Sequence, residues 1–380
     1  MNVLNVVPII APEVGGGVAE RAIQLACHVG AGDVIVKTVS IDLGLESMEA
    51  ASRIFGNLVL LPTLNRRFGI PQPRFRTLSK LVCDANVIHF SNHWSVLNAL
   101  VYIINLFYRR PYVVCPAGSL VDAAKSNKLK ILYDVVVGKR LLKNAAAVVA
   151  IVPREIESFK KYAIEEKNIV VIPNGIPLRE VKLEPNVQAH HKPYILFLGR
   201  LNKIKGIDLL IEAYLLCVAK DVPDYDLLIA GSDEGEWDAL SQRISDRGAE
   251  GYIHNVGFVS GARKDLLIAQ AGLMVIPSRS EAMSIVVLEA GLLSTPVLCT
   301  DECGLDDFIA RDLVEVCSPT VESVASGLRD FFESDGRVGQ ALSLNAIVRQ
   351  EFGWNAIGSI YENLFSKVQS NKDPFESLTE

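Results

Sequence analysis

The sequence predicts an α/β protein built from two Rossmann-like domains that face each other across a cleft, and three observations lead to this prediction. The chain has 380 residues, whereas single hydrophobic cores usually stop growing at about 250–300 residues. Short β-branched runs alternate with helical patterns, which is typical of parallel βαβ units. This alternation stops once, over the turn-rich segment 173–177 and the polar stretch to Pro193, and then restarts.

Each half contains six predicted strands, with amphipathic segments such as Ile207–Ala219 between them. The predicted strands are Val3–Val7, Val34–Val39, Val87–Phe90, Tyr112–Cys115, Val148–Ile151 and Ile169–Ile172 in the first half, and Tyr194–Leu198, Leu227–Ala230, Tyr252–Val256, Leu273–Ile276, Val297–Thr300 and Val314–Cys317 in the second. The apolar stretch Trp94–Tyr108 is shorter than the roughly 20 residues that span a bilayer. We interpret it as a buried helix.

Composition narrows the setting in which the protein works. The chain enters a strand directly at Asn2–Val7 without the features of a secretory signal, so we expect a cytoplasmic protein. Its seven cysteines are scattered without metal-site spacing, which predicts reduced thiols and no bound metal. No nucleic-acid partner is expected.

Charge is divided unevenly along the chain. The net charge is −6, yet residues 1–173 hold 20 basic and 13 acidic side chains, whereas residues 174–380 hold 18 and 31. Between Ala50 and Cys83 the basic side chains have no acidic neighbour in sequence; they are Arg53, Arg66, Arg67, Arg74, Arg76 and Lys80. Such a run indicates either a solvated face or an anionic partner, and the sequence leaves both open.

Three motifs follow predicted strands, where open parallel sheets bind their ligands. The first is Gly15-Gly16-Gly17, which opens the predicted helix Val18–Val29. Glycines let the backbone approach a diphosphate, and the start of a helix favours negative charge, so Gly16 and Gly17 are candidate donor-binding residues. A tight turn into a helix would use the same glycines. The spacing departs from the dinucleotide fingerprint, which leaves NAD binding as a minor alternative.

The second motif covers residues 199–206, directly after Tyr194–Leu198. Arg200 offers a two-pronged grip and Lys205 a point charge, and together they can neutralise a diphosphate. Fixed cations can stabilise the charge that develops on a leaving group without a metal ion. Both residues are therefore catalytic candidates, with two cations on a surface loop as the alternative.

The third motif contains Glu281 and Glu289, which would lie about 12 Å apart along a helix. That separation exceeds the roughly 5–9.5 Å between the two carboxylates of a glycosidase. It suits a long ligand, with Glu281 at sugar hydroxyls, Glu289 at a ribose diol and the backbone N–H groups of Ser284 and Ile285 at phosphates. A capping or salt-bridged glutamate is the alternative for Glu289.

Together these motifs resemble family 4 of the retaining GT-B glycosyltransferases, and the resemblance spans nearly the whole chain. The matching segments are Gly-Gly-Val after the first strand, residues 171–176, 199–206, 257–260, 281–289 and 291–297. The resemblance implies a metal-independent transferase that uses GDP-, UDP- or a similar activated sugar, with Arg200, Lys205 and Glu281 in catalytic roles. It also implies an acceptor-binding domain over 1–175, a donor-binding domain over 176–352 and a helix over 353–368 that crosses back to the first domain. GDP-mannose is our preferred donor.

The chain departs from this family at Ala117, because many relatives carry a histidine in the corresponding Pro-His-Gly element. His89 and His93 are the nearest replacements in sequence, and Asp122 is a further acceptor-side candidate. A histidine at such a position is more often a packed or hydrogen-bonded side chain than a catalytic one. The family is thought to use front-face attack, in which the donor phosphate takes the acceptor's proton, so the missing histidine need not abolish activity.

The basic first domain suggests where the acceptor binds. Over 125–143, six basic side chains alternate with leucine, isoleucine and valine, consistent with a helix on an anionic membrane surface. A core helix with a solvated basic face is the alternative. We hypothesise a peripheral enzyme at the inner face of the plasma membrane. It would transfer a hexose to a glycan or lipid-linked glycan in the synthesis of lipopolysaccharide or another surface polysaccharide. A nucleotide-sugar epimerase or phosphorylase of the same fold and a non-catalytic partner subunit are the alternatives.

Overall fold

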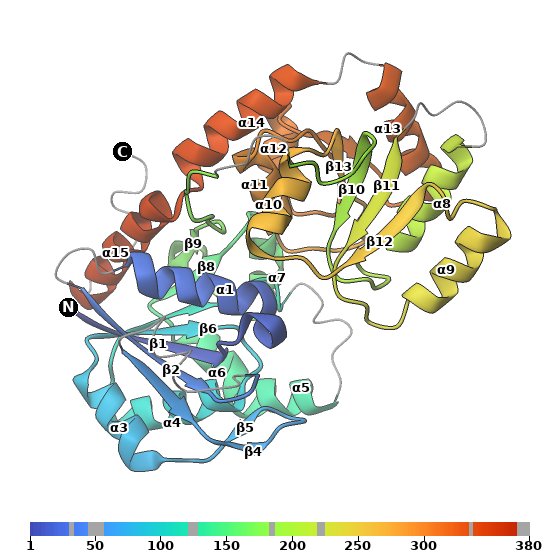
Figure 1. Ribbon diagram of the computed structural model, residues 1–380. Helices are drawn as coiled ribbons and strands as arrows, with labels where there is room; N and C mark the ends of the chain where they lie inside the picture. The colour runs from blue at the N-terminus through green and yellow to red at the C-terminus, as the bar shows by residue number, and fades with distance from the viewer. Residues whose placement is uncertain are drawn as a thin grey trace. The chain divides into compact units, whose positions relative to one another are not determined.

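The computed structural model describes residues 1–29, 34–44, 57–120, 128–181, 187–218, 225–333 and 337–370. The chain divides into two compact units, each with its own parallel sheet (Figure 1). Unit 1 comprises Met1–Pro177 together with Trp354–Glu380, and unit 2 comprises Leu178–Gly353. The predicted α/β class with two Rossmann-like sheets is therefore confirmed.

Unit 1 is built on a seven-stranded sheet in the order β3-β2-β1-β6-β7-β8-β9, in which all neighbouring strands run parallel. The strands are β1 Asn2–Ile9, β2 Ile35–Ile41, β3 Leu58–Leu61, β6 Val87–Ser91, β7 Tyr112–Cys115, β8 Ala147–Ala150 and β9 Ile169–Val171. A short antiparallel pair, β4 Thr63–Asn65 and β5 Ile70–Pro71, stands apart from the sheet. The six strands predicted for this half all occur, whereas β3, β4 and β5, which lie within the basic stretch, were not predicted.

The helices of unit 1 are α1 Pro12–His28, α3 Phe75–Asp84, α4 Val96–Tyr108, α5 Lys128–Tyr133, α6 Lys139–Lys143, α7 Glu155–Lys160 and α15 Trp354–Ser370. A π-helix at Asp134–Gly138 joins α5 to α6, and a 3-10 turn covers Glu166–Asn168. Helix α4 begins at Ser95, whose hydroxyl caps it by accepting a hydrogen bond from the backbone N–H of Asn98.

The prediction that this apolar helix is buried is wrong for one of its faces. Leu97 and Val101 of α4 are buried, but Leu106 is more than half exposed and Phe107 is 84% exposed. Helix α4 therefore has one apolar face buried in the core and a second apolar face exposed at the surface, which a core helix would not have. No helix in the described ranges is both long and apolar enough to cross a bilayer.

Helix α15 closes unit 1 by packing against α1, β6 and β7. The buried guanidinium of Arg21 in α1 joins three segments, because it donates to the Asn174 side chain (2.5 Å), the Ile172 carbonyl oxygen (3.0 Å) and the Tyr361 hydroxyl (2.6 Å). The backbone N–H of Trp354 donates to the carbonyl oxygen of Ile176 (3.1 Å). Helix α15 therefore completes the core of unit 1, although it is far in sequence from the strands of that core.

Unit 2 contains a six-stranded parallel sheet in the order β12-β11-β10-β13-β14-β15. Its strands are β10 Tyr194–Leu198, β11 Asp226–Ala230, β12 Ile253–Gly257, β13 Leu273–Ile276, β14 Val297–Thr300 and β15 Glu315–Cys317. Its helices are α8 Ile207–Val218, α9 Trp237–Asp246, α10 Gly261–Ala269, α11 Ile285–Leu292, α12 Asp306–Ala310, α13 Val321–Glu333 and α14 Val338–Glu351. All six strands predicted for this half occur within one residue of their predicted ends.

Both sheets contain a topological switch point, where successive strands begin to add on the other side of the first strand. In unit 1 this point lies between β1 and β6, and in unit 2 it lies between β10 and β13. Ligands of open parallel sheets bind beyond the carboxyl ends of the strands at such points. In unit 2 the loops at this point are the second and third sequence motifs.

Candidate active site

The candidate site lies at the carboxyl edge of the unit 2 sheet, where three loops pack against one another. These loops cover residues 199–206 after β10, 277–284 after β13 and 301–305 after β14. Gly206 has a φ of +69°, and a Cβ there would collide with the carbonyl oxygen of Pro277. Gly304 has a φ of +67°, and a Cβ there would collide with the carbonyl oxygen of Ala282. Only glycine allows this close approach of the loop backbones.

Two of the predicted catalytic residues meet between these loops. The ammonium of Lys205 lies 2.9 Å from Glu281 Oε2, and both side chains are largely buried. The Ser278 hydroxyl donates to Glu281 Oε1 at 2.5 Å, and the backbone N–H of Glu281 donates to the Glu302 carbonyl oxygen at 2.8 Å. The carboxylate of Glu281 is therefore fixed in position and neutralised by a cation that the next loop supplies.

Arg200 pairs with a different carboxylate in the structure. Its guanidinium contacts Glu234 Oε1 at 2.7 Å, while the Asn202 amide donates to Glu234 Oε2 at 2.7 Å. These hydrogen bonds, from Asn202 first and Arg200 second, lower the pKa of Glu234. The Arg200 side chain is 61% exposed. It is thus a cation on the same loop as Lys205 that remains open to solvent on most of its surface.

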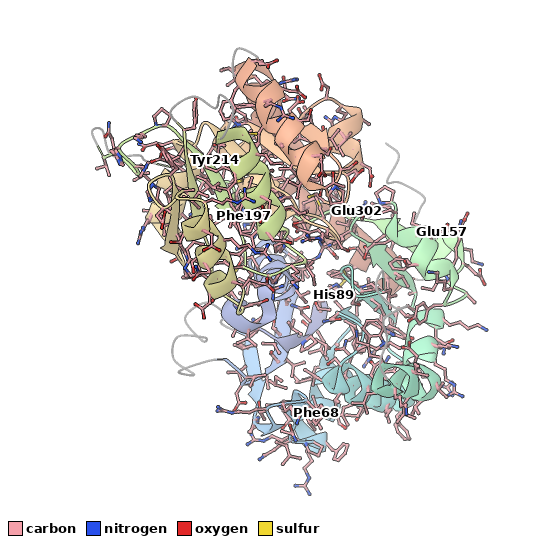
Figure 2. All side chains as sticks on the ribbon, turned by 90° about the vertical axis from the view of Figure 1, so that its right-hand side faces the viewer. Phe68, His89, Glu157, Phe197, Tyr214 and Glu302 are labelled. Carbon is pink, nitrogen blue, oxygen red and sulfur yellow. The ribbon has the colours of Figure 1, made fainter. Side chains whose placement is uncertain are left out.

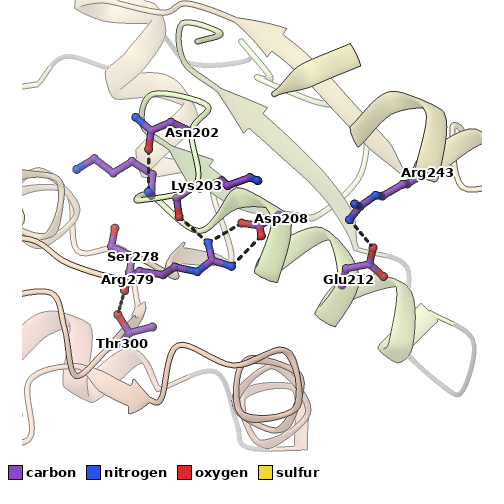
Figure 3. A network of polar contacts seen from close by, with 9 residues as sticks. Asn202, Lys203, Asp208, Glu212, Arg243, Ser278, Arg279 and Thr300 are labelled. Atoms are coloured by element: carbon purple, nitrogen blue, oxygen red, sulfur yellow. Dashed lines mark hydrogen bonds and ion pairs between the residues drawn. The ribbon is translucent and has the colours of Figure 1, made fainter. Parts of the chain in front are cut away.

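Arg279 ties the two motif loops together, as Figure 3 shows. Its guanidinium makes a two-pronged contact with Asp208 (2.7 Å to each oxygen) and also donates to the Lys203 carbonyl oxygen at 2.5 Å. Although burial acts to raise it, the pKa of Asp208 is lowered by the hydrogen bonds and charge of Arg279. The Thr300 hydroxyl donates to the Ser278 carbonyl oxygen at 2.5 Å and anchors the same loop to β14.

The start of α11 differs from the prediction in one respect. The backbone N–H of Ser284 donates to the Cys303 carbonyl oxygen at 3.1 Å, so this group is already engaged within the protein. The Ser284 hydroxyl is buried and has no hydrogen-bond partner in the described part of the chain. Ile285 is the first helical residue, and the first N–H groups of a helix lack partners within it. Glu281 precedes the helix, so helical rise does not set its separation from Glu289.

Glu289, inside the apolar helix α11, has a partner that the sequence pattern did not reveal. The Lys264 ammonium of α10 lies 2.6 Å from Glu289 Oε1. The side chains of Lys264 and Glu289 are 25% and 21% exposed. The salt-bridged form of this glutamate, an alternative already open from the sequence, is the one in the structure.

The switch point of unit 1 holds a histidine and a carboxylate in an aromatic setting. His93 is fully buried, and its Nε2 lies 2.7 Å from Asp134 Oδ1. Asp134 also accepts hydrogen bonds from the Trp94 indole (3.1 Å) and the Tyr162 hydroxyl (3.0 Å). Burial acts to raise the pKa of Asp134, but these hydrogen bonds, His93 foremost, lower it.

The glycine loop of unit 1 breaks α1 near its start. Gly16 has a φ of +56° and a ψ of −142°, so residues 12–15 form a turn that precedes the regular helix. A Cβ on Gly15 would lie 2.6 Å from the carbonyl oxygen of Ile9, which requires glycine at this position. Gly16 and Gly17 are exposed. Gly15 therefore packs closely against the end of β1, while Gly16 and Gly17, the predicted donor-binding residues, remain open.

Comparison with known proteins finds a family model that matches most of the second unit. Residues 179–347 match the model described as glycosyl transferases group 1. D-inositol 3-phosphate glycosyltransferase of Jonesia denitrificans is 27% identical over 192 residues, or 46% of this chain and 45% of the relative. O-antigen chain mannosyltransferase B of Escherichia coli is 26% identical over 183 residues, or 47% of this chain and 48% of the relative. The chain thus spans about half the length of the curated relatives it matches.

A solved structure extends the likeness to the whole chain. The structure of HepE from Anabaena in complex with UDP and glucose superposes with a TM-score of 0.77 at 19% identity, covering 96% of this chain and 100% of that one. At this identity the likeness shows the fold, which is GT-B. The predicted resemblance to family 4 GT-B glycosyltransferases is confirmed.

Among the acceptor-side candidates, His89 lies in the core (Figure 2). Its Nδ1 lies 3.0 Å from Asn5 Oδ1, and its ring contacts Tyr361 and Phe365 of α15. Burial, with the charge of Arg21 as a lesser cause, lowers the pKa of His89 to about 3. The structure therefore gives His89 a packing role and no surface for an acceptor. Asp122, like Arg53 and Lys125, lies outside the described residues.

The departure of this GT-B chain from the family at Ala117 has a structural counterpart. Ala117 has a left-handed backbone with φ +50°. The next N–H, of Gly118, donates to Glu155 Oε1 at 2.5 Å, and the N–H of Ile151 donates to Glu155 Oε2 at 2.6 Å. Glu155 is fully buried, and burial raises its pKa. Glu155 thus holds the loop that contains Ala117 through the backbone N–H of Gly118. Sequence reasoning missed this carboxylate, because backbone hydrogen bonds cannot be inferred from the pattern of side chains.

Proposed function

We propose that the chain is a retaining glycosyltransferase that transfers a hexose from a nucleotide sugar to a glycan acceptor in surface polysaccharide synthesis. The observation that carries this proposal is the Lys205–Glu281 pair at the switch point of a unit that matches the group 1 family model. Unit 2 would bind the donor, and unit 1 would bind the acceptor. The helix α15 would serve unit 1 as a structural brace.

The leaving diphosphate is the first part of the donor to place. Lys205 and Arg200 follow the same strand and both hold carboxylates that an incoming diphosphate can displace or share. The buried Ser284 hydroxyl, which lacks a partner among the described residues, and the first N–H groups of α11 add hydrogen-bond donors nearby in sequence to Glu281. A helix start favours negative charge, so this set suits phosphate oxygens.

The sugar and the ribose would take the two glutamates. Glu281 is fixed by Ser278 and by its backbone bond to Glu302, so it can accept hydrogen bonds from sugar hydroxyls in a defined position. Glu289 is held by Lys264 and retains exposed surface, which leaves an oxygen for a ribose diol. Arg279 is a positioning residue, because it holds the Lys205 loop against the Glu281 loop without contacting the donor itself.

The proposed step breaks the bond between the sugar C1 and the phosphate oxygen, and the acceptor oxygen attacks C1 from the same face. The acceptor's proton passes to the departing phosphate oxygen, so atoms and charge balance without a protein base. The cations stabilise the charge that the phosphate gains, and such electrostatic stabilisation is often the largest catalytic contribution. We therefore also propose that transfer needs no metal ion.

GDP-mannose is the proposed donor. Its support is the similarity to O-antigen chain mannosyltransferase B, whose name states a mannosyl transfer. The fold relative crystallised with UDP and glucose makes UDP-glucose the necessary comparison. A thermal-shift series with GDP-mannose, GDP, UDP-glucose and UDP tests this order, and a larger stabilisation by UDP-glucose than by GDP-mannose would contradict it.

Replacing Lys205 tests the site directly. We expect Lys205→Ala to lower turnover at least tenfold, because removal of one group that stabilises transition-state charge typically costs this much or more. Lys203→Ala is the matched control, since it removes an exposed cation from the same loop and should leave turnover within twofold. Wild-type turnover in Lys205→Ala would contradict the assignment of the leaving-group cation. Donor binding without turnover in the wild type would favour the non-catalytic subunit, and activity that is lost with EDTA and restored by Mg²⁺ would contradict metal independence.

An exposed surface of apolar and basic side chains on unit 1 supports the proposal of a lipid-linked acceptor. Helix α5 has no buried residue, and five apolar side chains of α5 and the π-helix are more than half exposed: Leu129, Ile131, Leu132, Val135 and Val136. Basic side chains alternate with them, namely Lys128, Lys130, Lys139 and Arg140. The alternative of a core helix with a solvated basic face does not fit α5, but it fits α6, where Leu141 and Leu142 are buried beside exposed basic side chains. Apolar groups inserted among basic ones suit an anionic lipid surface.

The short β4–β5 region adds a second patch of the same character. Leu64, Phe68 and Phe75 are each more than half exposed, and Figure 2 labels Phe68 at the lower margin of unit 1. Arg66 and Arg67 lie between Leu64 and Phe68 in sequence, and β5 contacts α4, which exposes Phe107. We propose that these surfaces hold the protein at the inner face of the plasma membrane, where anionic lipids give the cytoplasmic leaflet its negative potential.

Vesicle flotation tests this membrane contact. Wild-type protein should float with vesicles that contain anionic phospholipid and bind neutral vesicles at least fivefold less. Leu132→Glu should lower anionic-vesicle binding severalfold, because it places a charge within the apolar surface. Leu342→Glu, which changes an equally exposed leucine of unit 2, is the matched control and should bind like the wild type. Equal binding to neutral and anionic vesicles would overturn the proposal.

A further inference from the structure

Half of the chain's six histidines gather at one place in unit 2 that the proposed function does not use. His190 and the next residue, His191, both precede β10 in sequence, and His254 is the second residue of β12. Between them stands Asp226, the first residue of β11, with 1% of its surface exposed. A buried carboxylate surrounded by imidazoles calls for a chemical explanation.

Two of these rings converge on a single oxygen atom. His190 Nε2 lies 2.6 Å from Asp226 Oδ2, and His254 Nε2 lies 3.2 Å from the same atom. The other carboxylate oxygen, Oδ1, is buried and accepts no hydrogen bond within the described ranges; the Lys192 ammonium lies 3.5 Å from it. The side chains of His190 and His254 keep 13% and 32% of their surface exposed, so solvent ions can reach the cluster.

The geometry points to a binding site for a divalent transition metal of the Zn²⁺ class, held by His190, Asp226 and His254. One ligand atom from each residue lies within 4.8 Å of the others. Zinc bonds of about 2.0–2.2 Å place tetrahedral ligands about 3.3 Å apart, so the cluster needs only a small opening to admit the ion. Two imidazole nitrogens and one carboxylate oxygen leave a fourth position for water.

This site is separate from the donor site. Asp226 lies at the amino end of β11, whereas the motif loops follow the carboxyl ends of the strands. Four residue steps along a strand span roughly 13 Å. The metal would therefore join the segment that precedes β10 to β11 and β12, and it would stabilise unit 2 without entering the transfer reaction.

The positive charge of Lys192 should weaken the binding of a metal ion at this site. Its ammonium lies close to the free oxygen of Asp226 and over the Tyr252 ring, 5.5 Å from the ring centre. In the metal-free protein it compensates the buried negative charge, and in the metal-bound protein it repels the cation. Lys192→Gln should therefore tighten metal binding, which a simple histidine–aspartate hydrogen-bond cluster would not predict.

The test uses the full chain after removal of metals with a chelator, and it follows Zn²⁺ uptake by isothermal titration calorimetry. We expect one Zn²⁺ per chain, and saturation at a hundredfold excess over Kd should raise the Tm by roughly 5–10 °C. Co²⁺ should give the visible absorption of a tetrahedral site. His254→Gln should weaken binding at least tenfold, whereas the matched control His191→Gln, one residue beyond His190, should stay within twofold.

The outcomes separate this site from the proposed function. Absence of saturable uptake would overturn the inference, and so would equal affinity in His254→Gln and the wild type. Equal losses in His191→Gln and His254→Gln would also overturn it, because they would indicate unspecific chelation by surface histidines. His254→Gln should keep the wild-type rate of sugar transfer, so a failure of the proposed function leaves the calorimetric result independently interpretable.

Discussion

The switch points of the two sheets share a backbone plan but differ in how they hold charge. In unit 2, Lys205 and Glu281 pair across two loops and both retain some contact with solvent. In unit 1, His93 and Asp134 pair at 2.7 Å with the histidine fully buried against Trp94, Tyr133 and Tyr162. In the proposed function a ligand would exchange partners with the first pair through the more exposed cation, whereas in the second pair aromatic rings enclose the histidine and only Asp134 keeps exposed surface, at 14%.

This difference teaches that position in a fold does not by itself make a residue functional. His93 follows β6 directly, where a ligand-binding residue is expected, yet its ring is enclosed. In the proposed function, the more accessible groups of unit 2 are the ones that would change their hydrogen-bond partners when a donor binds. Variants in the two units should therefore affect different properties, activity in one and stability in the other.

The largest expected effect is on activity in unit 2. Glu281→Gln should lower kcat/KM about a hundredfold, equivalent to about 2.7 kcal/mol of transition-state stabilisation, because it removes the charge that holds Lys205 and orients the sugar. Steady-state transfer from GDP-mannose measures this effect. Glu302→Gln is the control, because Glu302 meets the Glu281 loop through its backbone carbonyl oxygen. Loss of less than threefold in Glu281→Gln would remove the functional contrast between the units.

The next effect is on the stability of unit 1 in acid. His89 has a pKa of about 3 in the folded chain against 6.5 unperturbed, so the unfolded chain takes up the proton first as pH falls. The stabilisation present above pH 6.5 is then lost at about 1.4 kcal/mol per pH unit toward pH 3. Urea unfolding at several pH values should show this slope in the wild type and in His28→Gln, and a smaller slope in His89→Gln. An unchanged slope in His89→Gln would contradict the buried neutral histidine.

The smallest effect concerns the link between the motif loops. Arg279→Gln should lower turnover about fivefold, because Lys205 and Glu281 would lose their fixed separation while both remain present. Asp208→Asn should give a similar loss. The double variant should lose no more than either single one, since residues that share one contact are not additive. Independent, multiplying losses would show that the Arg279–Asp208 pair does not act as a unit.

Sequence patterns predicted the strands well because burial and β-branching are local properties. Tyr112–Cys115, Tyr194–Leu198 and Leu273–Ile276 have the predicted limits. β3 was missed although it is as long as β7 and wholly apolar. The burial of α4 was overestimated because an apolar composition does not tell which face is covered. The candidate loops of unit 2 were located because they follow these strands.

Side-chain partners were harder to predict than elements. Arg279 pairs with Asp208, 71 positions away, and Glu289 pairs with Lys264 from another helix. No local pattern reports such contacts. The expectation of no bound metal rested on cysteine spacing, which says nothing about histidines brought together from 190 and 254. From the sequence, the N–H of Ser284 was predicted to bind phosphate. In the structure it donates to the Cys303 carbonyl oxygen, which belongs to a different loop and leaves no mark on the local sequence.

The backbone hydrogen bond between Trp354 and Ile176 has a consequence for the order in which the two units can fold during synthesis. Unit 2 is inserted between two parts of unit 1, and Arg21 finds its Tyr361 partner only after the whole insertion has been made. The ribosome therefore makes all strands of the unit 1 sheet first, but it makes helix α15, which completes the core of unit 1, only after the whole of unit 2. Domains usually fold in order from the N-terminus, and unit 1 cannot finish folding before unit 2 has been made. The nascent strands of the earlier sheet must wait with an unshielded guanidinium, so chaperones are expected to hold this half of the molecule longer.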